Sequence, residues 1–188
     1  MDARIVETHQ IWDGRVKLWR ARLVYADGSE TWREISWHGD SVAVLPFDAA
    51  RRVALTVSLL RAPALHLHRP QLPQEACAGM IDEGEGPEET VRREAMEEMG
   101  VRLADLECIG KTWPSPGVSG QQANLYLAPY TAADRVAAGG GAEGEHEHIT
   151  VLERPLGDLA ADADRGGIAD LCLLALIQTL RLRRPELF

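Results

Sequence analysis

The chain has 188 residues, and its 29 Asp and Glu against 20 Lys and Arg give a formal net charge of -9. That length favours one compact domain with a small appendage. Because an acidic surface repels a phosphate backbone and the sequence has no basic stripe, no nucleic acid polymer is expected as a partner. The chain opens without a basic segment followed by an apolar stretch, and no apolar run approaches the length of a bilayer span. We therefore expect a cytoplasmic protein with no membrane contact.

Alternating apolar and polar residues in the runs 16–25 and 30–37, joined by a turn at 26–28, predict an antiparallel hairpin. The tryptophans of this region are Trp12, Trp19, Trp32 and Trp37. Tryptophans in short strands favour cross-strand pairs or a dimer interface over stacking on a nucleobase. Residues 1–40 are accordingly predicted to form a small N-terminal β-strand subdomain, and residues 41–188 the main domain.

Three further runs are rich in Val and Leu and predict central strands of a second sheet, at residues 41–46, 53–60 and 125–130. A last helix is predicted over residues 168–183. Its apolar stripe is predicted to consist of Leu171, Leu174, Ile177 and Leu180. The Ala- and Gly-rich residues 137–144 run into an acidic stretch and predict an exposed loop that carries carboxylates. The three cysteines form no CxxC pair and are predicted to be reduced and buried.

The stretch 79–101 reads GMIDEGEGPEETVRREAMEEMGV and predicts a helix. A Gly-Pro pair marks its start, with proline at the first helical position, and a later glycine marks its end. Glu94, Glu97 and Glu98 fall at i, i+3 and i+4, so their carboxylates share one face. A neighbouring apolar stripe is formed by Val91, Ala95 and Met99. The helix can therefore bury one side while it presents three acids beside it.

Three unpaired carboxylates on one helix face repel one another and destabilise the helix by a few tenths of a kcal/mol, roughly, for each pair. Hard cations relieve this repulsion, and oxygen-only ligands suit Mg²⁺ or Mn²⁺. Arg93 is predicted to pair with Glu85 and so to hold the preceding loop against the helix. Taken alone, however, the short acidic run is more typical of a solvated helix face.

The complete spacing resembles the Nudix box, G-x5-E-x7-R-E-U-x-E-E-x-G-U, in which U is apolar. The matching positions are Gly79, Glu85, Arg93, Glu94, Ala95, Glu97, Glu98, Gly100 and Val101. The resemblance implies a metal-dependent hydrolase whose main domain is an α/β/α sandwich on a mixed β-sheet. It also implies that Glu94 and Glu98 are the principal metal ligands. Glu97 and the carbonyl of Ala78 join them, and Arg93 and Glu97 belong to the catalytic machinery.

The resemblance extends to EACAGMID at 75–82, WPSPGVS at 113–119 and AGGG at 138–141. These segments are similar to the Nudix branch that hydrolyses ADP-ribose and GDP-mannose. In that branch an E-x-E-x-I element follows the glycines, and here it is EHEHI at 145–149. The resemblance makes Glu147 a further metal ligand and Glu145 the general base, whereas a solvated loop is the alternative for this segment.

By the same resemblance, Arg33, Arg61 and Glu75 contact the substrate, and the N-terminal strands form a homodimer that lends Arg33 to the neighbouring site. Two segments depart from the branch pattern. The chain has VSLLR at 57–61 where VRQFR is common, and Gly-Gln at 120–121 where Thr-Glu is common. Both departures bear on the identity of the substrate and not on the class of reaction.

The expected reaction is hydrolysis of a nucleoside diphosphate sugar at its pyrophosphate bond, which gives a nucleoside monophosphate and a sugar phosphate. Two alternatives remain open. One is a Nudix-fold module that binds a nucleotide sugar, with a regulatory role and no catalysis. The other is an enzyme that cuts a different pyrophosphate, such as a dinucleotide. Loss of box carboxylates would be the mark of a binding module, and the box of this chain is intact.

Overall fold

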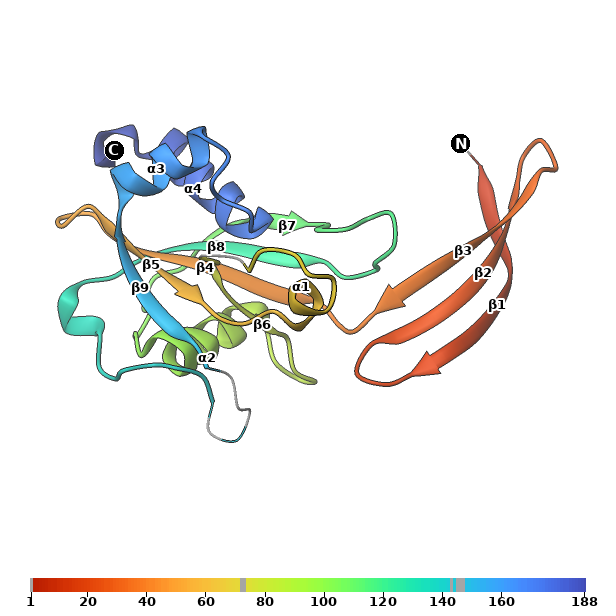
Figure 1. Cartoon of the computed structure of the whole chain (residues 1–188), viewed down its shortest axis with the longest axis horizontal. Coiled ribbons are helices and arrows are strands. Elements are labelled where there is room, and N and C mark those ends of the chain that lie inside the picture. The colour runs from red at the N-terminus through yellow and green to blue at the C-terminus, as the bar shows by residue number, and fades with distance from the viewer. Residues whose placement is uncertain (1, 72–73, 143, 145–147) are drawn as a thin grey trace. The chain divides into compact units, whose positions relative to one another are not determined.

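The computed structural model describes residues 2–71, 74–142, 144 and 148–188. The chain divides into two compact units, Met1–Asp40 with Thr112–Ala123 and Ser41–Lys111 with Asn124–Phe188 (Figure 1). The sequence patterns did not indicate that residues 112–123 would group with the N-terminal strands. Within the described residues, no helix is both long and apolar enough to cross a membrane.

The N-terminal unit is built on a three-stranded antiparallel sheet in the order β1-β2-β3. Its strands are β1 (Ala3–Asp13), β2 (Lys17–Tyr25) and β3 (Glu30–Trp37). Gly28 in the β2–β3 turn has a φ of +82°, a conformation that side chains rarely adopt. Ser36 on β3 donates its amide to the carbonyl of Val118 at 2.8 Å and accepts from the amide of Gly120 at 2.9 Å, so the 112–123 segment extends this unit. The predicted N-terminal antiparallel sheet is confirmed.

Strand β1 is exposed along nearly its whole length, including large apolar side chains. Ile5 is 56% exposed, Ile11 52% and Trp12 64%. Trp32, by contrast, stacks on the ring of His9 with centroids 5.9 Å apart. Exposed apolar side chains on an edge strand are uncommon in a chain that stays alone, because they invite pairing. The dimer expected from the sequence nevertheless stays a prediction.

The main unit is built on a six-stranded sheet in the order β7-β8-β4-β5-β9, with β6 also paired to β4. Its strands are β4 (Ser41–Asp48), β5 (Val53–Ser58), β6 (Cys77–Met80), β7 (Glu107–Thr112), β8 (Ala123–Pro129) and β9 (Thr150–Pro155). Strand β4 pairs antiparallel with β6 along one half and with β5 along the other. Asn124 of β8 donates its side-chain amide to Ser41 O at 3.0 Å, and Tyr130 N donates to Phe47 O at 2.9 Å. Because both positions advance together, β8 runs parallel to β4 and the sheet is mixed.

Helices cover both faces of this sheet (Figure 1). One face carries α2 (Pro87–Met99), and the other carries α3 (Leu156–Asp164) and α4 (Leu171–Arg183). Short helical turns complete the unit at α1 (Ala62–His66), η1 (Ala132–Asp134) and η2 (Pro185–Leu187). The expected α/β class, with a Nudix α/β/α sandwich, is confirmed.

The predicted apolar stripe of α2 is confirmed, because Val91, Ala95 and Met99 are all fully buried. They pack with residues of β4 and β5 in one cluster. Burial of this kind stabilises a helix far more than its intrinsic propensity does. The packed stripe thus fixes how α2 is rotated about its axis, and with it the direction of the neighbouring acids.

The prediction for the last helix needs correction. Helix α4 begins at Leu171, where Asp170 accepts from the amides of Cys172 and Leu173 as an N-cap, and not at residue 168. Leu171 itself is exposed. Leu174 is only half-buried. Ile177 and Leu180 are buried as predicted, and the other buried residues of the helix are Leu173 and Leu176. Residues 171–177 are all apolar, so periodicity alone could not select the buried face.

The prediction that the cysteines are buried is correct for one of the three. Cys77 on β6 is buried, Cys108 is exposed, and Cys172 is intermediate. All three are free thiols, as expected.

Candidate active site and metal centre

The site is built where strand β6 and helix α2 lie against each other. Strand β6 is fixed by its pairing with β4, in which Ala78 lies opposite Ala43 and Gly79 opposite Val42. Gly86 precedes the helix, Pro87 begins it, and Gly100 in the left-handed conformation ends it. A Cβ on Gly79 would overlap the carboxylate of Glu94. Any side chain at position 79 would therefore displace the Glu94 carboxylate from the place it has beside β6.

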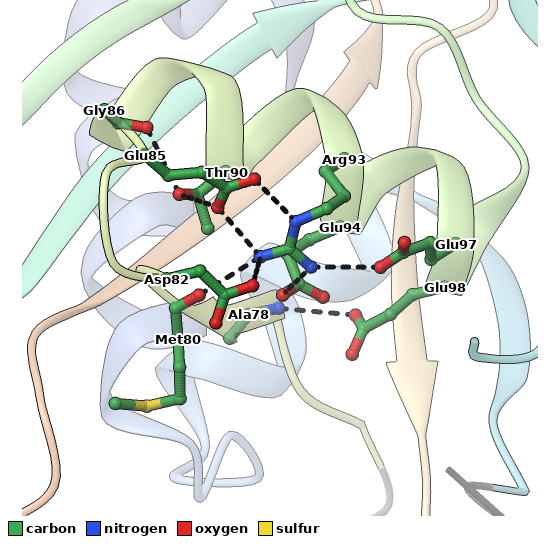
Figure 2. A network of polar contacts seen from close by, with 10 residues as sticks. All are labelled: Ala78, Met80, Asp82, Glu85, Gly86, Thr90, Arg93, Glu94, Glu97 and Glu98. Atoms are coloured by element: carbon green, nitrogen blue, oxygen red, sulfur yellow. Dashed lines mark hydrogen bonds and ion pairs between the residues drawn. The ribbon is translucent and has the colours of Figure 1, made fainter. Parts of the chain in front are cut away.

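Arg93 lies at the centre of the site and joins the loop, the strand and the helix (Figure 2). Its Nε donates to Glu85 Oε1 at 2.9 Å and its Nη2 to Glu85 Oε2 at 3.1 Å. Its Nη1 donates to Glu94 Oε1 at 2.8 Å and to Glu97 Oε2 at 3.1 Å. Nη2 also donates to the carbonyl of Met80 at 3.2 Å. The predicted pair of Arg93 with Glu85 is confirmed and is bidentate.

The same contacts correct the expectation of three unpaired carboxylates. Because one guanidinium bonds to both Glu94 and Glu97, the repulsion between these acids is offset within the chain. The Glu94 side chain is 14% exposed and that of Glu97 34%. Glu98 is 6% exposed, and its Oε2 accepts the amide of Ala78 at 3.3 Å. Arg93 therefore orients Glu94 and Glu97, whereas the backbone amide of Ala78 orients Glu98.

Glu98 also lies beside the thiol of Cys77, which is fully buried. Burial raises the pKa of this thiol well above its usual range, and the neighbouring Glu98 carboxylate raises it further. A thiol that stays protonated is a poor nucleophile and a poor metal ligand. Its burial and raised pKa make Cys77 a poor candidate for covalent chemistry.

The donor set fits a hard divalent cation. Glu94, Glu97 and Glu98 supply only oxygen atoms. They lie at i, i+3 and i+4 on one face of α2, beside Ala78 (Figure 2). Within the described part of the chain, no three His, Cys, Asp or Glu side chains lie together as a ready metal site. The Arg93 guanidinium bonds to carboxylate oxygens of Glu94 and Glu97 that a divalent cation would also use.

Glu85 attaches the loop before α2 to the helix. Thr90 Oγ1 donates to Glu85 Oε2 at 2.8 Å, in addition to the two bonds from Arg93. The Arg93 guanidinium, with help from Thr90, lowers the pKa of Glu85 from 4.5 to about 2. Because the folded pKa is below the ordinary value, ionised Glu85 stabilises the fold above about pH 4.5. That contribution is lost as the pH falls towards 2.

This shift predicts how the substitution Glu85→Gln depends on pH. In metal-free protein the variant should be less stable than the wild type at about pH 6, and the difference should shrink steadily below about pH 4.5. Urea unfolding of both proteins across this range measures it. Glu89→Gln, an exposed position in the first turn of the same helix, is the control. A difference that stays constant down to pH 3 would contradict the assigned role of Glu85.

The end of α2 is joined to a segment far away in the sequence. The amides of Val136 and Ala137 donate to Gly100 O at 2.8 and 3.1 Å. The amide of Gly140 donates to Glu98 O at 2.8 Å, and that of Gly141 donates to Glu97 O at 3.0 Å. The expected loop acids Glu145 and Glu147 lie outside the described residues. Beyond these two residues, Ile149 N donates to Gly140 O at 3.4 Å. The segments before and after the acidic loop therefore meet close to the C-terminal end of α2.

The predicted substrate contacts Arg61 and Glu75 bind each other. Arg61 donates from Nη2 to Glu75 Oε2 at 2.7 Å and from Nε to both carboxylate oxygens at 3.0 and 3.1 Å. Glu75 is 6% exposed, and its backbone exchanges two hydrogen bonds with Val57. Arg33, the third predicted contact, lies on β3 of the N-terminal unit and donates to Thr31 Oγ1 at 2.7 Å.

Two residues that support the site were not found from the sequence. Gln74 is 2% exposed, accepts from Arg154 at 2.9 Å and donates to Asp162 at 3.2 Å. Asp170 accepts the amide of Ala76 at 3.0 Å while it caps α4. An aspartate before an apolar helical run is a typical N-cap, which could have identified that role of Asp170. No local signal indicates the contacts with residues 74–76, because the partners are far apart in the sequence.

Comparison with known proteins agrees with this geometry. A model of the NUDIX domain family matches residues 37–183. A GDP-mannose pyrophosphatase of Cronobacter sakazakii is 34% identical over 152 residues, which cover 80% of this chain and 78% of the relative. GDP-mannose pyrophosphatases of Pectobacterium atrosepticum and Escherichia coli are 31% and 30% identical, and each match covers 80% of this chain and 77% and 79% of the relative.

Two observations define the class of protein. Helix α2 presents its glutamates on an α/β/α sandwich with a mixed sheet, and the family match covers most of the chain. The chain belongs to the NUDIX family. Within that family it is a pyrophosphohydrolase, in the branch of the GDP-mannose pyrophosphatases.

Proposed function

We propose that the chain hydrolyses the pyrophosphate bond of a nucleotide sugar of the GDP-mannose or ADP-ribose type, with Mg²⁺ or Mn²⁺ as its cofactor. The observation that carries the proposal is the set of acids on α2, which are buried or half-buried on one helix face beside β6. The names of the relatives support GDP-mannose as the first substrate to test. The products are a nucleoside monophosphate and a sugar phosphate.

In this proposal Glu94 and Glu98 hold the cation together with Glu97 and the carbonyl of Ala78. The cation supplies positive charge that neutralises the pyrophosphate oxygens and lowers the pKa of the attacking water. Arg93 keeps the loop closed through Glu85 and orients Glu94 and Glu97 through its Nη1. No residue of the site needs to form a covalent bond to the substrate.

We assign the loop acids to the same reaction. Glu147 adds a carboxylate oxygen to the cation, and Glu145 accepts the proton of the attacking water. Support comes from the flanks of the loop, because Gly140 and Gly141 bond directly to the carbonyls of Glu98 and Glu97. A loop anchored there can reach the acids of α2 with few intervening residues.

The remaining site residues complete the proposal. Arg61 contacts the substrate, and Glu75 holds its guanidinium in a fixed orientation through a bidentate pair. A planar, preorganised guanidinium suits recognition of a phosphate. Arg33 contacts the substrate bound by the other protomer of a homodimer, whose interface is formed by the exposed apolar residues of β1.

The dimer gives a direct expectation. The protein should sediment as a dimer at micromolar concentration, because burial of Ile5, Ile11 and Trp12 removes large exposed apolar side chains from water. Ile11→Asp should shift the protein towards monomer, whereas Leu182→Asp, at an apolar position on α4 that is even more exposed, should not. A wild-type monomer would reject the dimer and with it the role of Arg33 in the neighbouring site.

The decisive experiment for the function is a panel of pyrophosphates incubated with the protein and Mg²⁺. GDP-mannose, ADP-ribose and a dinucleotide are compared, and the products are separated by ion-exchange chromatography. Release of GMP and mannose 1-phosphate, or of AMP and ribose 5-phosphate, supports the proposal. Cleavage of the dinucleotide alone would favour the other enzymatic alternative. Tight binding without cleavage of any member would favour a binding module.

A further inference from the structure

The glycines before the acidic loop serve a purpose other than flexibility. Helix α2 ends at Met99, so its last carbonyl groups have no partner within the helix. The carbonyls of Glu97 and Glu98 are bonded instead by the amides of Gly141 and Gly140. The last turn of α2 is therefore closed by a segment that lies 42 to 44 positions further along the chain.

Close approach of the two backbones makes these bonds possible. A Cβ on Gly139 would overlap the carbonyl oxygen of Glu98 and lie 2.7 Å from the carbonyl carbon of Met99. A Cβ on Gly100 would overlap the carbonyl oxygen of Ala137 in the same contact. All of these obstacles are backbone atoms, so no side chain can rotate to make room.

Glu98 is thus held at both ends. Its backbone carbonyl is bonded by Gly140 at 2.8 Å, and its carboxylate accepts the amide of Ala78 on β6 at 3.3 Å. A shift of the last turn by a few tenths of an ångström moves the carboxylate relative to β6. Metal sites are sensitive to such shifts, because the residues behind the ligands set their orientation.

We infer that Gly139 is a positioning residue of the metal site, because its missing side chain lets the 136–141 segment fix the turn from which Glu97 and Glu98 project. This inference rests on the proposed function, in which these acids hold the cation. It differs from a flexible hinge, since backbone hydrogen bonds fix Gly140 and Gly141 to the last turn of α2.

The test compares Gly139→Ala with Gly166→Ala. Both glycines have nearly the same φ, +71° and +74°, so alanine introduces the same backbone strain at each. A Cβ on Gly166 meets no atom within 4 Å, so only the substitution at Gly139 disturbs a packed contact. Mn²⁺ binding is measured by the loss of the free Mn²⁺ electron paramagnetic resonance signal in the absence of substrate.

We expect Gly139→Ala to weaken Mn²⁺ binding about tenfold to a hundredfold, the scale on which residues behind metal ligands act. Gly166→Ala should bind Mn²⁺ as the wild type does, although the same backbone strain lowers its thermal stability as well. Equal Mn²⁺ affinity in the two variants would overturn the inference while leaving the proposed function intact. A wild type that binds no Mn²⁺ would reject the proposed function, and the inference with it.

Amide hydrogen exchange of the metal-free wild type provides a second test, which holds even if Gly139→Ala does not fold. The amides of Gly140 and Gly141 should exchange slowly, as those of α2 do, because they bond to the carbonyls of Glu98 and Glu97. Rapid exchange of both amides would show a hinge and overturn the inference, whatever the metal affinity.

Discussion

Glu98→Gln should lower kcat about a thousandfold, which corresponds to roughly 4 kcal/mol of lost transition-state stabilisation. The substitution keeps the shape of a side chain that is 6% exposed, and its amide oxygen can still accept from Ala78. What it removes is the negative charge that holds the cation in the proposed function. Metal-free protein should lose no stability and can gain some, because Glu94 and Glu97 no longer face a third carboxylate.

The measurement is kcat at saturating Mg²⁺ together with thermal unfolding in the presence of a chelator. Glu89→Gln is the matched control, since it removes the same charge from an exposed position at the other end of α2. The control should keep wild-type activity. If folded Glu98→Gln retained most of its activity, Glu98 would no longer count as a metal ligand.

Glu145→Gln and Glu147→Gln should act differently although only one residue separates them. Glu145→Gln should lower kcat by about a hundredfold to ten-thousandfold, the usual scale of general-base catalysis, without changing the Mg²⁺ concentration needed for half-activity. Glu147→Gln should raise that Mg²⁺ concentration, because a hard-cation ligand has been lost.

A Mg²⁺ titration of initial rates for both variants distinguishes the two roles. His148→Gln, in the same loop and exposed, is the control and should leave both parameters unchanged. Equal and mild effects of the two glutamate substitutions would mean that the loop is a solvated connection. The general base would then have to be sought among Glu97 and the neighbouring acids.

Features that depend on nearby residues were predictable from the sequence. Proline at the start and glycine at the end of α2 set its limits, and the i, i+3, i+4 spacing placed three acids on one face. The burial of Val91, Ala95 and Met99 followed from the same periodicity. The pair of Arg93 with Glu85 was predictable because both belong to one spaced motif.

The sequence was a poorer guide where one side chain bonds to several partners at once. The sequence predicted that the acids of α2 repel one another, whereas Arg93 bonds to both Glu94 and Glu97 as well as to Glu85. Spacing shows which residues can meet but not how one guanidinium distributes its five donors. The buried face of α4 was predicted correctly at Ile177 and Leu180 but wrongly in its first half, where every residue is apolar and only packing on the sheet selects among them.

The sequence by itself therefore determined helix α2, its caps and the carboxylates that it presents, since each follows from contacts within one or two turns. Only the tertiary structure decided what lies around that helix. It brought the glycines at 139–141 to the carbonyls of Glu97 and Glu98, and Arg61 to Glu75. Such contacts join backbone or side-chain atoms of separate elements. They arise when the packed core brings those elements together, and no local pattern encodes them.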